Sequence, residues 1–541
     1  MKICSHDQRS GLLLLMIASV ILLFFIVGSI FFTEGHWVYT LDDAYIHLQM
    51  AKNLANSGTW GISPETFTAC SSAPLWTLFL AGCYSLLGAC DWIPGLINFS
   101  ACLFILFVAD KTWAAFGVEL RLRVIAGLGL LLFCPLTVIV STGMEHTVHV
   151  FLILLFLLSV MNRLADTNHM CRGTSKSLIS VCVWATLATG FRYETWFLVI
   201  PALGLLVLQR QWRCCFFLFI SASMPILLFG LYSLAHGGFF LPNSLMLKGR
   251  IPDWHLSPLI QQLFSMYVRV SLENVHVHLL CILMLLTASC ARIQQKIRSG
   301  LLMLIAGCIL HLTLSECGWF YRYEAYLMAP GLILLGAAWL RKDTLSLILA
   351  HTVKGPPSAA LGWVTFSRIA LLFFLVTPLL IRGIWANSRI VRASTNIYEQ
   401  QWQLARIFKT LEKGQARLAI NDLGSMSYQF SSSVVDLWGL GSTEVTRLKY
   451  TKRYDRVAVQ QLLSRQRVDY VVVFDQWFSR RSLLPQELVL VAKLRNTKNI
   501  VCLEDTVMLY ALDVEKAESL KHHLRALPFK LPKGTSIEFC Y

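Results

Sequence analysis

The sequence predicts a polytopic α-helical membrane protein that carries an α/β domain at its C-terminal end. Of its 541 residues, 56% are hydrophobic and only 14% are charged, whereas about a quarter of residues are charged in soluble domains. Apolar runs close to the ~20 residues needed to cross a bilayer recur from residue 11 to about residue 386. Beyond that point the sequence becomes mixed and polar. We therefore expect a membrane domain over 1–386 and an extracytoplasmic domain over 387–541.

Basic residues in the short loops set the orientation, because lysine and arginine favour the cytoplasmic side. Placing these loops inside gives about eleven transmembrane helices, including spans at 122–141 and 366–386. The apolar stretches 72–90 and 94–109 must together contain an odd number of crossings, so one of them is expected to be partial or interfacial. The segments predicted to lie outside are 142–145, 192–194, 236–275, 317–324 and 387–541. The C-terminal part is therefore expected outside the cytoplasm.

The C-terminal part alternates helical and strand patterns. Val468–Phe474 has the density of β-branched residues typical of a buried strand. About 150 residues are enough to bury a core of their own, so a small α/β domain follows. The predicted helices cover 398–413 and 456–465, and the predicted strands cover 417–421, 468–474, 486–493 and 500–512.

The formal net charge of +16 is largely explained by the cytoplasmic basic loops. No basic stripe with interleaved aromatics is present, so nucleic acid is not an expected partner. Most of the cysteines lie inside apolar runs, where cysteine behaves as a small hydrophobe, and no metal-ligand spacing is visible. We expect no cofactor and leave a divalent metal requirement open.

The first outside loop carries two adjacent acids, Asp42 and Asp43, ten residues after the first apolar run. Apolar residues then recur at helical spacing over 43–56, which predicts an amphipathic helix on the outer membrane surface. An acid at its head could be an N-cap, but one acid suffices for a cap. The doublet therefore favours a general base, with either acid in that role. His47 lies one turn beyond Asp43 and is either an orienting partner, a metal ligand or an interfacial residue.

Three further acids and one base are candidates for substrate contacts. Glu65 lies in a turn-rich segment that leads to Ser71 and Ser72, where it could contact sugar hydroxyls or simply form a polar turn. Glu145, Arg192 and Glu194 lie where short spans meet. A charge near bilayer depth costs about 2.5–3.5 kcal/mol, so such residues usually face a cavity. The alternative is a purely structural salt bridge among the three.

Cations and aromatics gather in the two remaining outside loops. Lys248 lies in the longest loop, and Arg322 lies with Tyr323 in the compact 317–324 loop. Cations suit a phosphate, and rings suit the membrane interface and a sugar. An ordinary aromatic belt with basic side chains reaching the interface would look similar.

These motifs together resemble those of the GT-C integral-membrane glycosyltransferases. The resemblance rests on Leu41-Asp-Asp-Ala-Tyr-Ile-His47, on Ser72-Ala-Pro-Leu-Trp76, and on a series of later motifs in the same order. It is closest to the bacterial arabinofuranosyltransferase branch, and it implies a catalytic acid at Asp42 or Asp43. Tyr193 stands where proline is common in that branch. The later motifs are Gly143-Met-Glu145, Arg192-Tyr-Glu194, Leu241-Pro-Asn-Ser244 with Lys248, Arg322-Tyr323, Asn421-Asp-Leu-Gly-Ser425 and Val435-Asp-Leu-Trp-Gly-Leu440.

The sequence thus predicts an enzyme that moves a sugar from a polyprenyl-phosphate donor to a glycan or glycolipid acceptor of the cell envelope. The acid would take the proton of the acceptor hydroxyl, and Lys248, Arg322 and Arg192 would hold the leaving phosphate. Two alternatives stay open. A glycan or lipid transporter would use the same buried charges as a pathway, and a polymerase would join whole repeat units.

Overall fold

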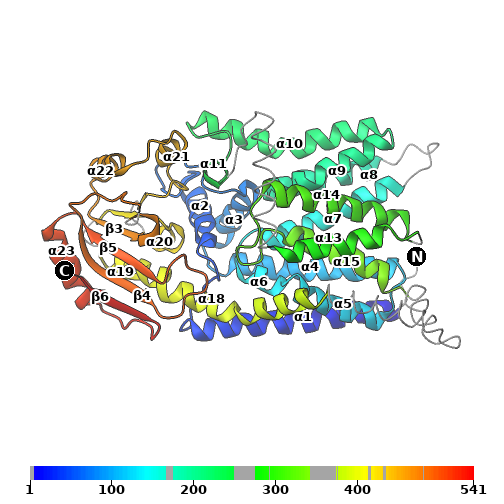
Figure 1. Cartoon of the computed structure of the whole chain (residues 1–541), viewed down its shortest axis with the longest axis horizontal. Coiled ribbons are helices and arrows are strands. Elements are labelled where there is room, and N and C mark those ends of the chain that lie inside the picture. Colours follow the sequence, from blue (N-terminus) through cyan, green and yellow to red (C-terminus); the bar gives the residue numbers. More distant parts are fainter. Residues whose placement is uncertain are drawn as a thin grey trace.

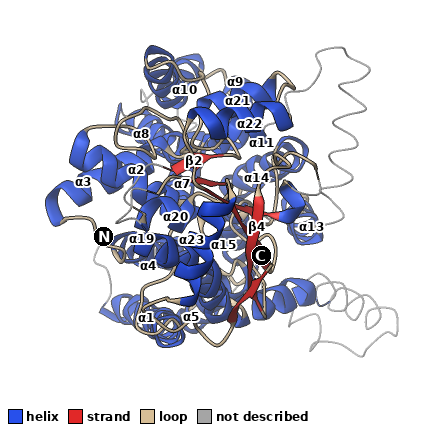
Figure 2. Ribbon diagram, turned by 90° about the vertical axis from the view of Figure 1, so that its left-hand side faces the viewer, coloured by secondary structure: helices blue, strands red, loops and turns tan. Residues whose placement is uncertain are grey.

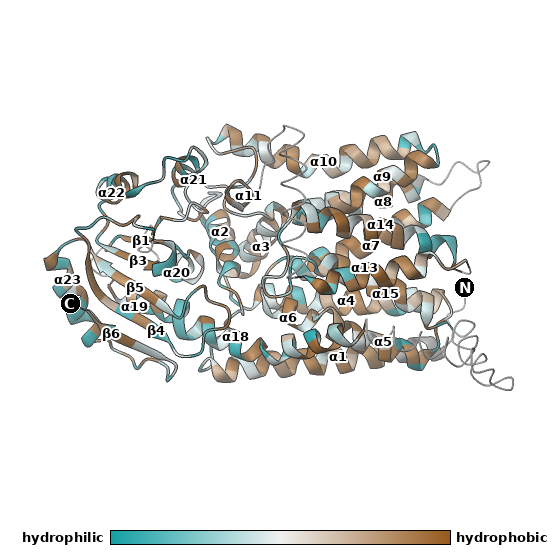
Figure 3. Cartoon of the chain, in the orientation of Figure 1, coloured by the Kyte–Doolittle hydropathy of each residue, from teal (hydrophilic) through white to brown (hydrophobic). Residues whose placement is uncertain are grey.

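A computed structural model of the chain describes residues 5–165, 175–248, 274–291, 293–341, 373, 376–411, 416–430, 434–478 and 481–540. It has two parts, as Figure 1 shows. Long helices run side by side along the major axis, and a sheet with its own helices lies at the end that is remote from the N-terminus. Hydrophobic residues dominate the bundle, whereas the sheet end carries most of the hydrophilic segments (Figure 3).

Five helices in the described residues are long and apolar enough to cross a membrane. They are the apolar part of α1 (Gly11–Phe32), α4 (Ile93–Ala115), α7 (His146–Ala165), α10 (Trp212–Ala235) and α14 (Gln295–Leu314). Five shorter apolar segments accompany them, namely α3 (Pro74–Leu87), most of α8 (Ser175–Phe191), η1 (Tyr193–Thr195) with α9 (Trp196–Leu208), α13 (Val275–Ala288) and α15 (Ala325–Trp339). The chain is a multi-pass membrane protein.

The structure differs from one predicted span, and most of another lies outside the described residues. The segment expected to be one helix over 122–141 is two helices, α5 (Leu120–Phe133) and α6 (Leu136–Ser141). Pro135 separates them because proline lacks the N–H that would continue the helix. In the 72–109 region α3 has 14 residues and α4 has 23, so α4 alone reaches the length of a full crossing. Most of the predicted span 366–386 lies outside the described residues.

The bundle packs around α7, which contacts α4, α8, α14 and α15. Its buried side chains include Phe156 and Leu157, neither of which is exposed to solvent. Trp113 of α4 is buried too, and its indole N–H donates to the carbonyl of Ile333 in α15 at 2.9 Å. These contacts fix the ends of α4, α7 and α15 relative to one another, which is what positions the loops described below.

The predicted surface helix is present as α2 (Asp43–Ser57). It ends at Gly58, whose φ of 70° is the left-handed conformation that glycine adopts without steric cost. Helix α2 packs against α3 on one side and against α20 (Gly424–Gln429) of the C-terminal part on the other. It therefore joins the bundle to the sheet end, rather than lying free on a membrane surface.

A helical segment leads from the bundle into the sheet. Helix α18 (Ile390–Ile397) lies along α1, and the π-helical turn η2 (Tyr398–Trp402) and α19 (Gln403–Leu411) continue it. Helicity here begins before the predicted start at residue 398. Short helix α11 (Asn243–Lys248) contacts α21 (Thr443–Tyr450), which gives the two parts another contact.

The C-terminal part is a six-stranded mixed sheet in the order β2-β1-β3-β5-β4-β6. The first three of these strands pair in parallel and the rest pair antiparallel. The view from the sheet end shows helices surrounding the strands (Figure 2). The strands are β1 (Leu418–Ile420), β2 (Val434–Asp436), β3 (Tyr470–Phe474), β4 (Val489–Asn496), β5 (Thr506–Ala511) and β6 (Thr535–Phe539).

Strand β3 shows why the sheet is covered on both faces. Tyr470, Val472 and Phe474 belong to one core with α19 and α23 (Val514–Arg525), and Val471 and Val473 belong to another with α21 and α22 (Arg456–Arg465). Alternate residues of a strand point to opposite faces, so a strand buried on both faces must be apolar throughout. The prediction of an α/β fold is confirmed, although β2, β6, α20, α21 and α23 were not predicted.

Candidate active site

A cavity of about 150 Å³ lies where α2 meets the bundle. Six of the predicted site residues line it, namely Asp43, His47, Arg192, Glu194, Arg322 and Tyr323. They come from three separate stretches of chain, so the fold brings them together. Its volume is below the roughly 300–1,000 Å³ of pockets that enclose a whole drug-sized ligand. The cavity therefore suits the reacting groups of a ligand, and we call it the inner cavity.

Asp43 and Arg322 form the central charged pair of the inner cavity. The Arg322 Nη2 atom lies 2.5 Å from Asp43 Oδ2. The arginine side chain is 2% exposed and the aspartate side chain 29%, so the carboxylate faces the opening. Tyr323 adds a second contact, since its hydroxyl lies 3.1 Å from Nη2 and its ring centroid 4.9 Å from the guanidinium. Arg322 is thus held from two sides.

The backbone just before Arg322 is strained. Trp319, Phe320 and Tyr321 have φ values of 35°, 59° and 67°, and Gly318 is left-handed as well. Left-handed conformation costs roughly 1–2 kcal/mol for each residue other than glycine, and such strain is concentrated at functional sites. Glu324 anchors the turn, because its buried carboxylate accepts the Gly318 N–H at 2.9 Å. The turn directs Arg322 back toward Asp43.

Glu145 contacts two residues that line the inner cavity and is itself completely buried. Its carboxylate lies 2.7 Å from Arg192 Nη1 and 3.7 Å from His47 Nε2. Arg192 also pairs with Glu194, its Nε lying 3.1 Å from Glu194 Oε2. The salt bridge weighed as an alternative therefore exists among these three residues. Arg192 and Glu194 nevertheless line the cavity, so the salt bridge also shapes the cavity wall.

His47 connects Glu145 to the segment that precedes α3. Its Nδ1 lies 3.1 Å from the Ser71 hydroxyl, which in turn accepts from the Thr77 hydroxyl at 3.0 Å. Burial lowers the pKa of His47, and the charge of Glu145 opposes this fall. A neutral imidazole that is hydrogen-bonded on one side is suited to orienting its neighbours rather than to binding an anion.

Asp42 occupies a different environment from Asp43. Its carboxylate accepts the backbone N–H of Ser425 at 2.8 Å and lies against the Asp422 carboxyl. Gln401 Nε2 donates to Asp422 from the other side at 2.9 Å. A Cβ added at Gly424 would lie 2.1 Å from Asp42 Oδ2, so only glycine permits this approach. Asp42 therefore joins the C-terminal domain to α2 and does not line the inner cavity.

The Asp42 environment favours a protonated acid. Burial raises the pKa of Asp42 to about 6, and the charge of Asp43 adds to the rise while the Ser425 N–H opposes it. Burial and the Asp42 charge also raise the pKa of Asp422. Two carboxyls in contact are most stable when they share one proton. Asp42 and Asp422 thus form a protonated link between the two domains.

Besides Asp42 and Glu145, two further predicted residues do not line the inner cavity. Glu65 is exposed and lines another cavity, against the C-terminal domain. Lys248 ends α11, and its side chain lies outside the described residues. Residues that the prediction missed include Met144, Glu316 and Leu440, which all line the inner cavity. Glu316 could have been noticed as an acid bordering a predicted outside loop, whereas Met144 and Leu440 lie within the quoted motifs but carry no charged or hydroxyl group that would mark them as site residues.

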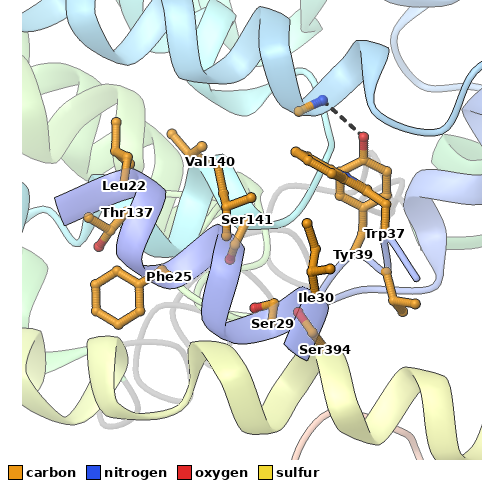
Figure 4. A pocket seen from close by; sticks show the side chains of 13 residues that line it. Leu22, Phe25, Ser29, Ile30, Trp37, Tyr39, Thr137, Val140, Ser141 and Ser394 are labelled. Atoms are coloured by element: carbon orange, nitrogen blue, oxygen red, sulfur yellow. Dashed lines mark hydrogen bonds between the residues drawn. The ribbon is translucent and has the colours of Figure 1, made fainter. Parts of the chain in front are cut away.

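A third cavity, of about 40 Å³, lies beside the C-terminal half of α1. Its lining is mostly apolar, with Leu22, Phe25, Ile30 and Trp37 among the residues shown in Figure 4. The Gly95 N–H donates to the Tyr39 hydroxyl at its edge, at 2.9 Å. No charged residue occurs among its lining residues, so it lacks groups for acid–base chemistry. Within the described residues no group of three or more His, Cys, Asp or Glu side chains could hold a metal ion.

Comparisons with known proteins address the fold of the whole chain. Residues 395–510 match a family model described as a domain of unknown function (DUF8728). A search of curated proteins finds no match. Among solved structures, ArnT from Cupriavidus metallidurans bound to undecaprenyl phosphate has a TM-score of 0.54 at 11% identity, covering 93% of this chain and 98% of that one.

An archaeal structure gives a similar result. The apo oligosaccharyltransferase of Archaeoglobus fulgidus has a TM-score of 0.52 at 12% identity, covering 97% of this chain and 76% of that one. At such identities a match establishes the fold and not the reaction. Both matches extend over the helical bundle and the C-terminal domain of this chain, so the similarity in fold covers both parts. The chain therefore shares the fold of these two structures, which agrees with the GT-C-like fold expected from the sequence.

Proposed function

We propose that this chain is a glycosyltransferase that moves a sugar from a polyprenyl-phosphate donor to a cell-envelope glycan or lipid at the outer face of a bacterial inner membrane. The observation that carries the proposal is the Asp43–Arg322 pair in the inner cavity, with an N–O distance of 2.5 Å. It sets a carboxylate beside a buried guanidinium at the end of the bundle nearest the sheet domain. Glycosyl transfer from a phosphate donor needs a base and a cation in that proximity.

The pair also suggests an order of events. Asp43 Oδ2 contacts the Arg322 guanidinium. A donor phosphate that binds Arg322 would compete for the same guanidinium and release the carboxylate. Asp43 could then accept the proton of the acceptor hydroxyl as that oxygen attacks the anomeric carbon. General base catalysis of this kind typically contributes 10²–10⁴-fold.

The remaining residues would position the groups that react. The Arg192 guanidinium lies 5.8 Å from the Tyr323 ring centroid, so two guanidinium groups lie near that ring. The carboxylates of Glu145 and Glu194 already contact Arg192, so Arg192 would orient the donor more than neutralise it. Lys248 remains a proposed phosphate contact from α11.

Replacing Arg322 by methionine tests this mechanism. A leaving phosphate gains charge as its bond to the sugar breaks, so a cation aimed at it favours the transition state over the bound donor. Purified full-length protein in lipid nanodiscs would be given a panel of polyprenyl-phosphate sugars. Arg322→Met should lower kcat by roughly 10–10³-fold and donor affinity by less. Arg453→Met, which replaces an exposed arginine of the C-terminal domain, serves as the control.

A transporter would give a different result in the same assay. Affinity and flux would fall together in Arg322→Met, and neither protein would release free polyprenyl phosphate. Equal losses of kcat and affinity in the presence of turnover would show instead that Arg322 binds the donor uniformly and does not stabilise the leaving group.

A further inference from the structure

The described residues include a second polar cavity, which lies outside the inner cavity. It has a volume of about 570 Å³ and lies between the first outer loop and the C-terminal domain. We call it the outer cavity. Ser63 and Glu65 line it from the loop, and Arg417, Ser442 and Gln466 line it from the C-terminal domain. Its volume falls within the roughly 300–1,000 Å³ of small-molecule sites, so it could hold a ligand of the size of a saccharide unit.

The lining of the outer cavity suits a neutral polyhydroxylated ligand. Hydroxyl, carboxylate, amide and guanidinium groups occur in it beside apolar patches such as Ile62, Val435 and Leu462. A sugar has the same two characters, with hydroxyls around its rim and C–H groups on its faces. The charged lining residues are three acids, Glu65, Asp436 and Glu444, and one base, Arg417. An excess of carboxylates disfavours a phosphate, so the donor headgroup fits this cavity poorly.

One loop of the C-terminal domain separates the two cavities. Asp436 holds that loop in place, because its carboxylate accepts the N–H groups of Trp438, Gly439 and Gly441 at 2.6, 2.9 and 2.6 Å. Leu440 lines the inner cavity, whereas Gly441 and Ser442 line the outer one. The Asn243 amide donates to the Leu440 carbonyl at 3.2 Å. A ligand in the outer cavity is thus separated by one wall from the place where Asp43 and Arg322 meet.

We propose that the outer cavity is a subsite for a saccharide unit of the acceptor glycan, a proposal that rests on the function proposed above. The donor is tied to the bilayer by its lipid, whereas a glycan acceptor extends away from it. A subsite formed by the C-terminal domain and the first outer loop would hold the glycan while its terminal hydroxyl reaches Asp43. Glu65 then contacts the acceptor and not the donor.

Direct binding tests the subsite without requiring turnover. The probes are fluorescently labelled tetrasaccharides of arabinose, galactose, mannose and glucose, titrated against full-length protein in nanodiscs. Glu65→Trp fills the cavity from the loop, and Glu518→Trp on the exposed face of α23 is its control. Gln466→Ala removes a polar group from the opposite wall, and the exposed Gln460→Ala is its control.

We expect at least one probe to bind the wild type. Glu65→Trp should weaken that binding by roughly ten-fold or more, and Gln466→Ala by roughly three- to ten-fold, as expected for the loss of one or two hydrogen bonds. Both controls should bind as the wild type does. Failure of every probe to bind, or equal binding by cavity and control variants, would overturn the proposal.

Turnover separates this proposal from the one on which it rests. If the protein transfers sugar and Glu65→Trp raises the acceptor KM while leaving donor KM unchanged, both stand. Sugar transfer with the same acceptor KM in Glu65→Trp and Glu518→Trp removes the subsite alone. Saccharide binding that Glu65→Trp abolishes, in a protein that releases no polyprenyl phosphate, removes the glycosyltransferase function and leaves a saccharide-binding cavity.

Discussion

Replacing each acid of the Asp42–Asp43 doublet by asparagine should have sharply different effects. The two residues are adjacent in sequence, but only Asp43 lines the inner cavity. Asp42 contacts Ser425 and Asp422 in the C-terminal domain. Asparagine keeps the size of the side chain and removes its basicity. Each variant is therefore a matched control for the other.

The expected magnitudes follow from these contacts. Asp43→Asn removes the base and should lower sugar transfer by about 10²–10⁴-fold. It also removes one partner of the pair with Arg322, and orphaning a buried charge costs roughly 3–5 kcal/mol. The Asp43 side chain is 29% exposed and Tyr323 still contacts Arg322, so the loss of stability should be smaller. Asp42→Asn keeps an oxygen for the Ser425 N–H and should retain transfer to within roughly ten-fold.

The assay is sugar transfer by purified protein in nanodiscs, with thermal unfolding of each variant measured in parallel. The parallel measurement is needed because a loss of folded protein would also lower transfer. The reasoning is refuted if Asp43→Asn retains near wild-type turnover while folded. A loss in Asp42→Asn as large as that in Asp43→Asn, at unchanged thermal stability, would equally refute the division of roles.

Three other results are expected. Glu145→Gln should lower the thermal midpoint, because it removes the carboxylate 2.7 Å from Arg192. The loss of stability should be below the roughly 3–5 kcal/mol of an orphaned buried charge, since Glu194 still pairs with Arg192. An unchanged midpoint would contradict this. The pKa of Asp42 is raised from 3.8 to about 6 on folding, mainly by burial. Its contribution to stability is therefore fully present below about pH 4 and is lost as pH rises through 6. Asp42→Asn should flatten that dependence in thermal scans from pH 4 to 7, and an unchanged profile would contradict the raised pKa. In spheroplasts, an impermeant maleimide should label a cysteine that replaces the exposed Glu518 in a cysteine-free protein, and should not label one that replaces the exposed Arg210. The reverse pattern would invert the predicted topology.

The sequence predicted the bundle well because its signals are local. Apolar runs of about 20 residues and basic loops locate helices without knowledge of their packing. The break at Pro135 was missed because the apolar run continues on both sides of it. Strand β2 was missed because its three residues, Val434–Asp436, are too few to show the alternation of apolar and polar residues that marks a strand. Such a short strand exists because β1 pairs with it.

The candidate site was predicted in its composition but not in its pairings. Buried charges in outside loops are unusual enough to be recognised individually, and Asp43, Arg192 and Arg322 were found in this way. The contact between Asp43 and Arg322 joins residues 279 positions apart, which no local pattern encodes. The different environments of Asp42 and Asp43 depend on Ser425 and Asp422. Sequence therefore could not say which acid faces the cavity.

The central claim is that the protein breaks the bond between a sugar and a polyprenyl phosphate. The most direct measurement is the amount of free polyprenyl phosphate released per sugar transferred, by purified protein in nanodiscs with a panel of polyprenyl-phosphate sugars and a membrane glycan extract. The account predicts one polyprenyl phosphate for each sugar transferred by the wild type, and almost none by Asp43→Asn. Movement of intact lipid-linked sugar across the membrane, with no free polyprenyl phosphate from any donor, would contradict it.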